Sequence, residues 1–158
     1  MSLPLPSSLS PSKVSAFRDC ALAFRFSAID RLPEPPSAPA MKGTLVHRVL
    51  ELLYCEPAPD RTRARAGELL ELATADMLAD PTFALLGFDE VATAEFVADA
   101  SVMVDRYFGL EDPTRIEPIG VELRLEMDLD GLVLRGIIDR LDLVDGELVV
   151  SDYKNGRV

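Results

Sequence analysis

Acidic side chains near the C-terminal end of the sequence have the types and the spacing to bind a divalent metal ion. Glu122, Asp139 and Asp152 lie on three successive apolar runs that short turns would bring side by side, and Lys154 follows two residues after Asp152. Carboxylate oxygens are the donors that Mg²⁺ and Mn²⁺ prefer, and these hard ions keep several waters when they bind. The pattern therefore indicates a metal centre.

Two Asp-Gly pairs, at 130–131 and 145–146, separate these apolar runs. Asp-Gly between runs of alternating hydrophobicity is the strongest short-range signal for a β-hairpin with a two-residue turn. The sequence therefore predicts three antiparallel strands, at about 119–129, 132–144 and 147–154.

Two-residue turns would also fix which residues oppose each other across the strands. Asp139 would oppose Glu122 on one side and Asp152 on the other, and Lys154 would point from the same face as Asp152. Like charges about 5 Å apart repel by roughly 3 kcal/mol at an effective dielectric constant near 20, so a proton or a cation is expected between them. A longer turn would shift the register and would remove the alignment with Glu122 first.

The face that carries this acidic row also carries apolar side chains, so we expect it to point toward the core: Ile137, Leu141, Leu143, Leu148 and Val150. Carboxylates on an apolar face beside a lysine suit metal binding better than they suit solubility. The alternative is purely structural, with edge charges in salt bridges and Lys154 neutralising Asp152.

The first two thirds of the sequence are typical of helices that could position this row. A helix over about 12–26 is expected to begin after Ser10-Pro11, because serine caps helices and proline suits the first turn. Three basic side chains of this helix would stay available to solvent or phosphate: Lys13, Arg18 and Arg25. The proline-rich stretch 33–40 is expected to be a linker, and further helices are expected over 42–54, 61–79 and 89–108.

The composition fits one folded domain, since 48% of the 158 residues are apolar and 27% are charged. The apolar runs are too short to span a membrane, and the N-terminus has no signal-peptide pattern, so a cytoplasmic protein without a membrane partner is expected. The net charge of −11 argues against a nucleic-acid partner. Its distribution softens that objection, because residues 1–50 carry six basic against three acidic groups, whereas residues 81–158 carry seven against seventeen.

Residues 136–156, GIIDRLDLVDGELVVSDYKNG, resemble the core motif of the PD-(D/E)XK nucleases, in particular the RecB-type exonuclease branch. In that branch a G-x-x-D-R-x-D strand and a hairpin lead to a D-x-K strand that ends in Lys-[Thr/Asn]-Gly, which residues 136–142 and 152–156 match. Residues 43–47 match the G-x-x-x-H pattern of an upstream helix. Residues 10–20 are similar to the first-helix pattern S-x-S-x-x-x-[FY]-x-x-C, with the serines shifted by one or two positions.

This resemblance implies an α/β (α+β) fold with a restriction-endonuclease-like core, in which N-terminal helices precede a three-stranded antiparallel β-meander within a single domain over 1–158. It implies that Asp139 and Asp152 bind catalytic Mg²⁺ or Mn²⁺ and that His47 adds a ligand from the helix beside the sheet. Lys154 would orient or deprotonate the attacking water and stabilise charge on the phosphate. Glu122 is a weaker candidate ligand, because it rests on the predicted register. Candidate DNA contacts are Lys13, Arg18, Arg25 and Arg140.

The sequence departs from the family in its cysteines. In one subset of the family a cysteine at the position of Cys20 joins three C-terminal cysteines around a [4Fe–4S] cluster. Besides Cys20 the sequence contains only Cys55, which lies in a different segment, so no cluster is expected in this chain and one is conceivable only in a full-length form. The family's helix after the D-x-K strand is also missing, so we expect a truncated nuclease domain that lacks its C-terminal helix and cysteine cluster.

The function that the resemblance implies is divalent-metal-dependent cleavage of DNA by an exonuclease of repair or recombination. The alternative is a non-catalytic, nuclease-like module that binds metal or DNA and recruits a helicase partner. The intact set of Asp139, Asp152 and Lys154 favours the enzyme. An acidic helical scaffold, a third possibility, would not need the row of carboxylates.

Overall fold

The computed structural model describes residues 6–154, and the chain divides into two compact units. The first unit comprises the N-terminal segment up to Pro35 together with Glu122–Ile138, and the second comprises Pro36–Val121 together with the segment from Asp139 onward. Among the described residues, no helix combines the length and the apolar character that a membrane span requires.

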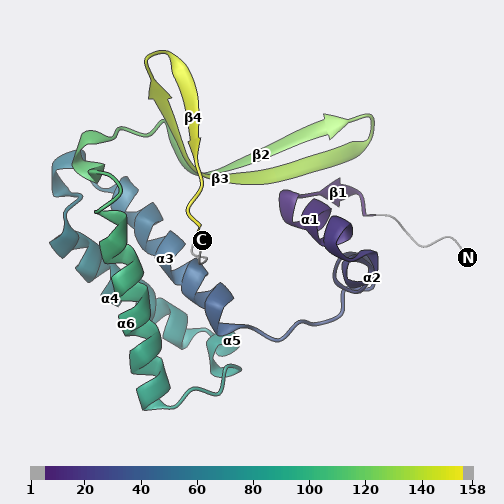
Figure 1. The fold of residues 1–158 in the computed structure, drawn as a ribbon, viewed down its shortest axis with the longest axis horizontal. Helices are drawn as coiled ribbons and strands as arrows, with labels where there is room; N and C mark the ends of the chain where they lie inside the picture. The colour runs from purple at the N-terminus through teal and green to yellow at the C-terminus, as the bar shows by residue number, and fades with distance from the viewer. Residues whose placement is uncertain (1–5, 155–158) are drawn as a thin grey trace, which may run out of the picture. The chain divides into compact units, whose positions relative to one another are not determined.

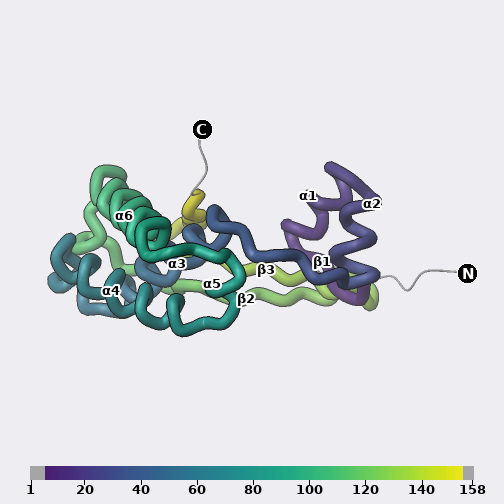
Figure 2. The backbone as a smooth tube through the Cα atoms, turned by 90° about the horizontal axis from the view of Figure 1, so that it is seen from below, coloured from purple at the N-terminus to yellow at the C-terminus, as the bar shows by residue number. Residues whose placement is uncertain are grey.

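Three long helices form the body of the second unit. The helices α3 (Ala38–Cys55), α4 (Arg63–Ala79) and α6 (Glu90–Tyr107) lie side by side, with the short helix α5 (Pro81–Ala84) between α4 and α6 in the chain (Figures 1 and 2). Short 3₁₀ turns at Ala58–Asp60 and Pro113–Arg115 connect the elements. The core is formed mainly by α3, whose fully buried side chains include Leu45, Val49 and Leu53.

The sequence predicted these three helices closely, with a difference at the start of α3. The predicted helix over 42–54 begins at Ala38, because the Ser37 hydroxyl accepts a hydrogen bond from the Ala40 amide and Pro39 fits the first turn. The predicted proline-rich linker therefore ends at Ser37. Thr62 and Asp89 cap α4 and α6 in the same way.

The first unit begins with the strand β1 (Ser8–Leu9) and a broken helical segment. The single helix predicted over 12–26 is wrong, because α1 (Pro11–Asp19) ends before Cys20 and α2 (Ala21–Phe24) follows it, continued by a π-helical turn at Arg25–Ile29. Cys20 has extended backbone angles (φ −158°, ψ 106°), and its thiol accepts the amide of Ala23. Cys20 thus acts as the cap of a second helix rather than as a residue inside one.

The sheet contains β1, β2 (Gly120–Leu129), β3 (Leu132–Val144) and β4 (Glu147–Ser151), with β3 hydrogen-bonded to each of the others. The prediction of a purely antiparallel, three-stranded meander is therefore wrong. β1 runs parallel to β3, where Ser8 pairs with Val133 and Leu9 with Leu134. The added strand has two residues, too few to show an alternating pattern in the sequence.

The two predicted hairpins are confirmed. Both residues of each Asp-Gly pair have positive φ, at 52° and 88° for 130–131 and at 52° and 85° for 145–146, which are the values of type I′ turns. The β3–β4 register also follows the prediction, since Val144 pairs with Glu147 and Arg140 with Ser151. β4 ends at Ser151, however, so Asp152 and Lys154 lie just after the strand and not within it.

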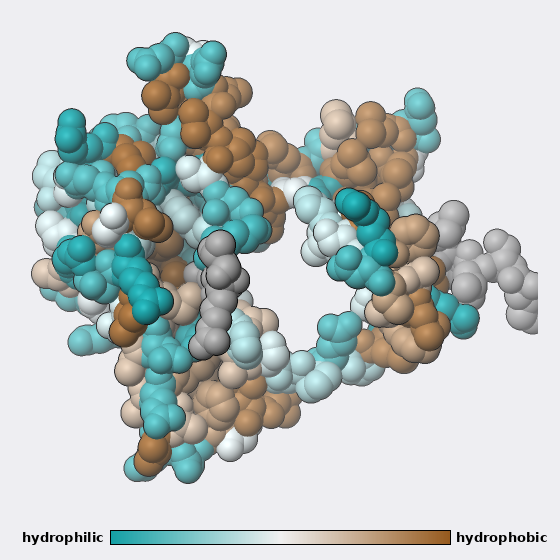
Figure 3. All heavy atoms as spheres, viewed as in Figure 1, coloured by the Kyte–Doolittle hydropathy of each residue, from teal (hydrophilic) through white to brown (hydrophobic). Residues whose placement is uncertain are grey.

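The prediction of which strand face points to the core is wrong. Arg140 and Asp142 are buried, whereas the alternate positions Leu143, Leu148 and Val150 are 57% or more exposed. Figure 3 shows hydrophobic residues at the surface in the place where Figure 1, in the same view, draws the β3–β4 hairpin. Strand periodicity determines which residues share a face, but the helices determine which face is covered.

We expect the packing of α3 to dominate the stability of the second unit. Leu53→Ala should lower the free energy of unfolding by about 2–5 kcal/mol, because the methyl groups of this fully buried side chain leave a cavity. Urea denaturation measures the change, and the matched control is Leu85→Ala, at a position that is 72% exposed. Equal losses in the two variants would contradict the assignment of Leu53 to the core.

Candidate metal centre

His47 on α3 and Asp139 on β3 meet in the second unit. Nδ1 of His47 lies 3.6 Å from Oδ1 of Asp139, and the two side chains are 28% and 12% exposed. Nε2 of His47 lies 2.9 Å from the carbonyl oxygen of Tyr153. A carbonyl only accepts hydrogen bonds, so this contact places a proton on Nε2, and in a neutral ring Nδ1 then carries the lone pair that faces Asp139. A nitrogen lone pair beside a carboxylate oxygen is a favourable arrangement when a cation binds both.

Tyr153 holds both of these side chains through its main chain. Its amide donates a hydrogen bond of 2.7 Å to Oδ2 of Asp139, while its carbonyl accepts the one from His47. The Tyr153 ring also packs edge-to-face against the His47 imidazole, with ring centres 6.0 Å apart. The residue between Asp152 and Lys154 is therefore the one that orients His47 and Asp139.

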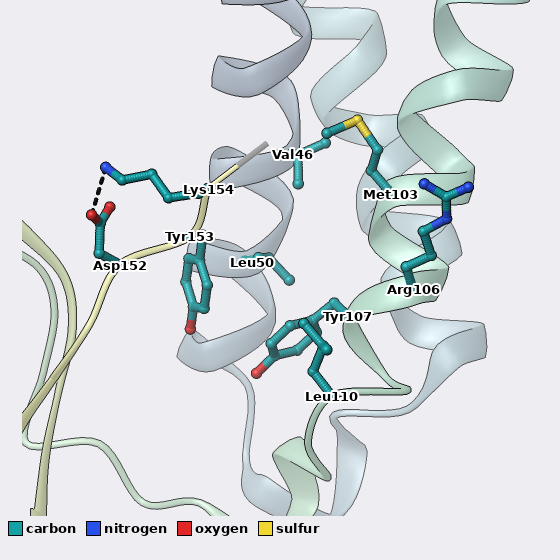
Figure 4. A pocket seen from close by; sticks show the side chains of 9 residues that line it. All are labelled: Val46, Leu50, Met103, Arg106, Tyr107, Leu110, Asp152, Tyr153 and Lys154. Atoms are coloured by element: carbon teal, nitrogen blue, oxygen red, sulfur yellow. Dashed lines mark ion pairs between the residues drawn. The ribbon is translucent and has the colours of Figure 1, made fainter. Parts of the chain in front are cut away.

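Asp152 and Lys154 form an ion pair at the surface, with Nζ of Lys154 2.5 Å from Oδ2 of Asp152 (Figure 4). The hydrogen bond from Lys154 lowers the pKa of Asp152, and the Lys154 charge lowers it further. The same hydrogen bond raises the pKa of Lys154. This ion pair is the contact that the structural alternative predicted, and the catalytic role of Lys154 stays a prediction.

Glu122 occupies β2 directly after Val121, with its backbone in the left-handed region at φ 47°. The Ile119 amide donates to the carbonyl of Leu141, whereas the register set by the Asp130-Gly131 turn would place Ile119 opposite residue 142. β2 therefore holds one more residue than the facing part of β3, which is the definition of a β-bulge, and the left-handed Glu122 has the backbone conformation of such a bulge.

His47 and Asp139 of the second unit each offer a ligand atom to a metal ion, and Glu122, which belongs to the first unit, stays a predicted third ligand. Two carboxylates and an imidazole suit a hard divalent cation such as Mg²⁺ or Mn²⁺. Asp139 also contributes to the pKa shift of Asp152, so these two carboxylates of the second unit are close neighbours. The donor set of the candidate site therefore fits the metal that the sequence predicted.

Arg140, a predicted DNA contact, has a different place in the structure. Its side chain is 4% exposed, and its guanidinium binds both oxygens of Glu111, at 2.5 and 2.9 Å. The hydroxyl groups of all three tyrosines of the chain, Tyr54, Tyr107 and Tyr153, also lie within hydrogen-bond distance of Nη1 and share its two hydrogens with Glu111. A guanidinium enclosed in this way cannot reach a phosphate at the surface, so we assign it to positioning β3.

The charges in this cluster stabilise one another. Burial lowers the pKa of Arg140, but the hydrogen bonds and charge of Glu111, with the neighbouring tyrosines, raise it well above its ordinary value. Burial raises the pKa of Glu111, and the hydrogen bonds from Arg140 and Tyr107, together with the Arg140 charge, reverse that effect and lower it. Burial also raises the pKa of Tyr153, so its phenol stays protonated and available for Arg140.

The remaining predicted site residues lie in the first unit. Lys13 donates to the Ser8 carbonyl at 3.1 Å, Arg25 pairs with Asp30 at 3.1 Å, and Arg18 is exposed. Their contact with DNA stays a prediction. Cys20 is a free, exposed thiol, and its role as an iron–sulfur ligand in a longer form also stays a prediction. Asn155 and Gly156 of the D-x-K motif lie outside the described residues.

Sequence reasoning missed Tyr153 and the partners of Arg140. The D-x-K motif specifies Asp152 and Lys154 and leaves the identity of the residue between them open. A usable signal existed, because the chain has only three tyrosines and a buried arginine needs several acceptors. No pattern in the sequence connects residues 54, 107 and 153, which only the packing of three elements brings together.

Comparison with known proteins supports the family suggested by the motifs. A family model described as the PD-(D/E)XK nuclease superfamily matches residues 8–158. The chain is also 28% identical, over 169 aligned residues, to the Gene 69 protein of Mycobacterium phage D29. The alignment covers 93% of this chain and 62% of the phage protein, so the chain spans less than two thirds of the length of that relative.

We expect Tyr153→Phe to weaken metal binding, because the variant loses the hydroxyl that Arg140 holds and so loosens the main chain that orients His47 and Asp139. Tyr54→Phe is the matched control, since Tyr54 also binds Arg140 but has no hydrogen bond to either ligand. Both variants should lose about 1 kcal/mol of stability. Calorimetric titration with Mn²⁺ should show weaker binding in Tyr153→Phe alone, and equal affinities in the two variants would contradict the positioning role.

The Glu111–Arg140 pair should make stability depend on pH. Because the folded state lowers the pKa of Glu111, its ionised form stabilises the protein above the ordinary glutamate range, and this contribution is lost as the pH falls through the folded-state pKa. Glu111→Gln should therefore destabilise the protein most near pH 7, with a difference from wild type that shrinks below about pH 4. Urea denaturation across this range measures the difference, with the exposed Glu95→Gln as the control. A difference that does not change with pH would exclude the ionic role.

Proposed function

The chain belongs to the PD-(D/E)XK nuclease superfamily, and on that basis we propose that it is a deoxyribonuclease of the RecB type that cuts phosphodiester bonds as an exonuclease in DNA repair or recombination. The coarser assignment, a metal-dependent nuclease, follows from the family match and the ligand group together. The observation that carries the proposal is the meeting of His47 and Asp139 in the second unit, where Nδ1 of His47 lies 3.6 Å from Oδ1 of Asp139.

We assign the ligands to His47, Glu122, Asp139 and Asp152. When bound, Mg²⁺ or Mn²⁺ would supply an activated water and a Lewis acid at the scissile phosphate. Nδ1 of His47 and Oδ1 of Asp139 face each other, and the Tyr153 main chain fixes both side chains from behind. Little reorganisation of these two ligands is needed, which is the arrangement that favours metal binding and catalysis.

Lys154 is the proposed catalytic cation. Its side chain is 79% exposed and pairs with Asp152, and exposed ion pairs are weak and screened by salt. When Asp152 becomes a metal ligand, Lys154 can turn toward the substrate. There it would orient the attacking water and stabilise the negative charge that grows on the phosphoryl oxygens.

A second candidate function is a non-catalytic module that binds metal or DNA and recruits a helicase. The observation that favours it is the Asp152–Lys154 ion pair, which shows that Lys154 can serve as a counter-ion without any reaction. A helicase partner, the DNA contacts of Lys13, Arg18 and Arg25, the cytoplasmic location and the single nuclease domain over 1–158 stay predictions.

The nuclease proposal is tested by cleavage of single- and double-stranded DNA with Mg²⁺ or Mn²⁺ and then with a chelator. Lys154→Ala should lower the cleavage rate by about a hundredfold or more while Mn²⁺ affinity and melting temperature stay near wild type, because the lysine acts on groups whose charge changes in the transition state. Lys42→Ala is the matched control, since Lys42 is also paired with an exposed aspartate, Asp99.

Two outcomes would contradict parts of this proposal. Near-wild-type cleavage in Lys154→Ala would exclude the catalytic role of the lysine. Metal binding without cleavage in the wild-type chain would favour the non-catalytic module, and equal Mn²⁺ affinity in wild type and Asp139→Ala would remove the assigned metal site itself.

A further inference from the structure

A pocket of about 370 Å³ opens directly beside Asp152 and Lys154 (Figure 4). It lies within the second unit, between α3, α6 and the segment that follows β4. Val46 and Leu50 of α3 and Met103 of α6 line one part of it. The rings of Tyr107 and Tyr153 and the side chain of Leu110 continue this lining, and the charged side chains of Arg106, Asp152 and Lys154 complete it.

Apolar and aromatic side chains line the inside of the pocket, and the cations of Lys154 and Arg106 lie at its edge. Figure 4 shows Lys154 on one side and the Arg106 guanidinium of α6 on the other. Lys154 pairs with Asp152, whereas within residues 6–154 the Arg106 side chain has no hydrogen bond or ion pair. An unpaired guanidinium at the rim of an apolar pocket is suited to bind an anion whose neighbouring group enters the pocket.

A nucleotide has these two parts. Its base is flat with apolar faces, and it binds apolar and aromatic side chains without regard to sequence, while cations follow the phosphates. The pocket lies at the lower end of the volumes typical of small-ligand sites, which suits one nucleoside and not a base pair. The two tyrosine hydroxyls are bound to Arg140, and Asp152 is paired with Lys154, so recognition by stacking and apolar contact is favoured over recognition of sequence.

We propose that this pocket binds one unpaired nucleobase of a DNA strand, beside the phosphodiester that is cut, and that Arg106 binds a flanking phosphate. The proposal rests on the proposed nuclease function and adds the class of substrate. A base in a duplex must leave its partner before it can enter such a pocket, and this costs free energy. The substrate is therefore single-stranded DNA or the frayed end of a duplex.

The test uses DNA that contains 2-aminopurine, a fluorescent base whose emission changes with stacking. Binding is measured in an Asp139→Asn background, which removes one metal ligand and so preserves the DNA, and Asp139 does not line the pocket. A single strand should bind and its fluorescence should change, whereas the same sequence as a blunt duplex should bind more weakly and show no change.

Two variants should reduce this binding. Leu110→Asp, at a position that is 84% exposed and thus tolerant of substitution, places a negative charge in the pocket, and Arg106→Ala removes the proposed phosphate contact. Each should weaken single-strand affinity by about fivefold or more, the range expected for one base contact. The matched controls are Leu85→Asp and Arg115→Ala, two exposed positions of the second unit outside the pocket, and these should bind like the parent protein.

The outcomes separate this proposal from the nuclease itself. Fluorescence that does not change on binding, or equal losses in the pocket variants and their controls, would overturn the pocket proposal even if the wild-type chain cuts DNA. A change that depends on Leu110 and Arg106, in a wild-type chain that cuts nothing with any metal, would support the pocket while overturning the nuclease. Tighter binding to the blunt duplex than to the single strand would overturn the substrate class.

Discussion

The buried guanidinium of Arg140 is the constraint on which the second unit depends. A charge taken out of water must be paired and hydrogen-bonded, and loss of one partner of such a buried pair costs about 3–5 kcal/mol. Here the partners come from two helices and the segments that follow α6 and β4: Tyr54 lies in the last turn of α3, Tyr107 ends α6, Glu111 follows α6 and Tyr153 follows β4. Each must be in place for the charge to be satisfied, so the position of β3 against the helices is fixed within narrow limits.

The burial of Arg140 also determines the geometry of the candidate site. Asp139 is the residue before Arg140, and Tyr153, which Arg140 holds by its hydroxyl, binds Asp139 and His47 through its main chain. His47 and Asp139, which are 92 positions apart in the sequence, are thereby placed for the proposed ion. A buried ionic cluster contributes little net stability compared with apolar packing, but it specifies one arrangement, and a metal centre needs that specificity.

The sequence predicted the features that depend on local chemistry. It did not predict the features that depend on how distant segments pack against each other. Asp-Gly turns gave both hairpins and the β3–β4 register, because only residues that tolerate positive φ fit type I′ turns. The broken first helix required knowing that the Cys20 thiol can cap a helix, and β1 is too short for a pattern. The covered face of β3 could not be predicted, because Arg140 and Asp142 look like surface residues until three tyrosines and Glu111 surround them. The roles of His47 and Asp139 came from a motif, whereas that of Tyr153 required the fold.

Besides its role in cleavage, the proposed ion would offset the negative charge around the site. Residues 81–158 carry ten more acidic than basic groups, and this segment contains most of the proposed ligands, so without a cation it repels phosphate. Lys154 is engaged with Asp152, which leaves few cations beside the site to offset the carboxylates. A divalent ion bound by His47, Asp139 and Asp152 would offset the charge of both carboxylates and release Lys154 from its role as counter-ion. In the proposed enzyme the ion therefore weakens the repulsion that the DNA meets at the site and also serves the cleavage that follows.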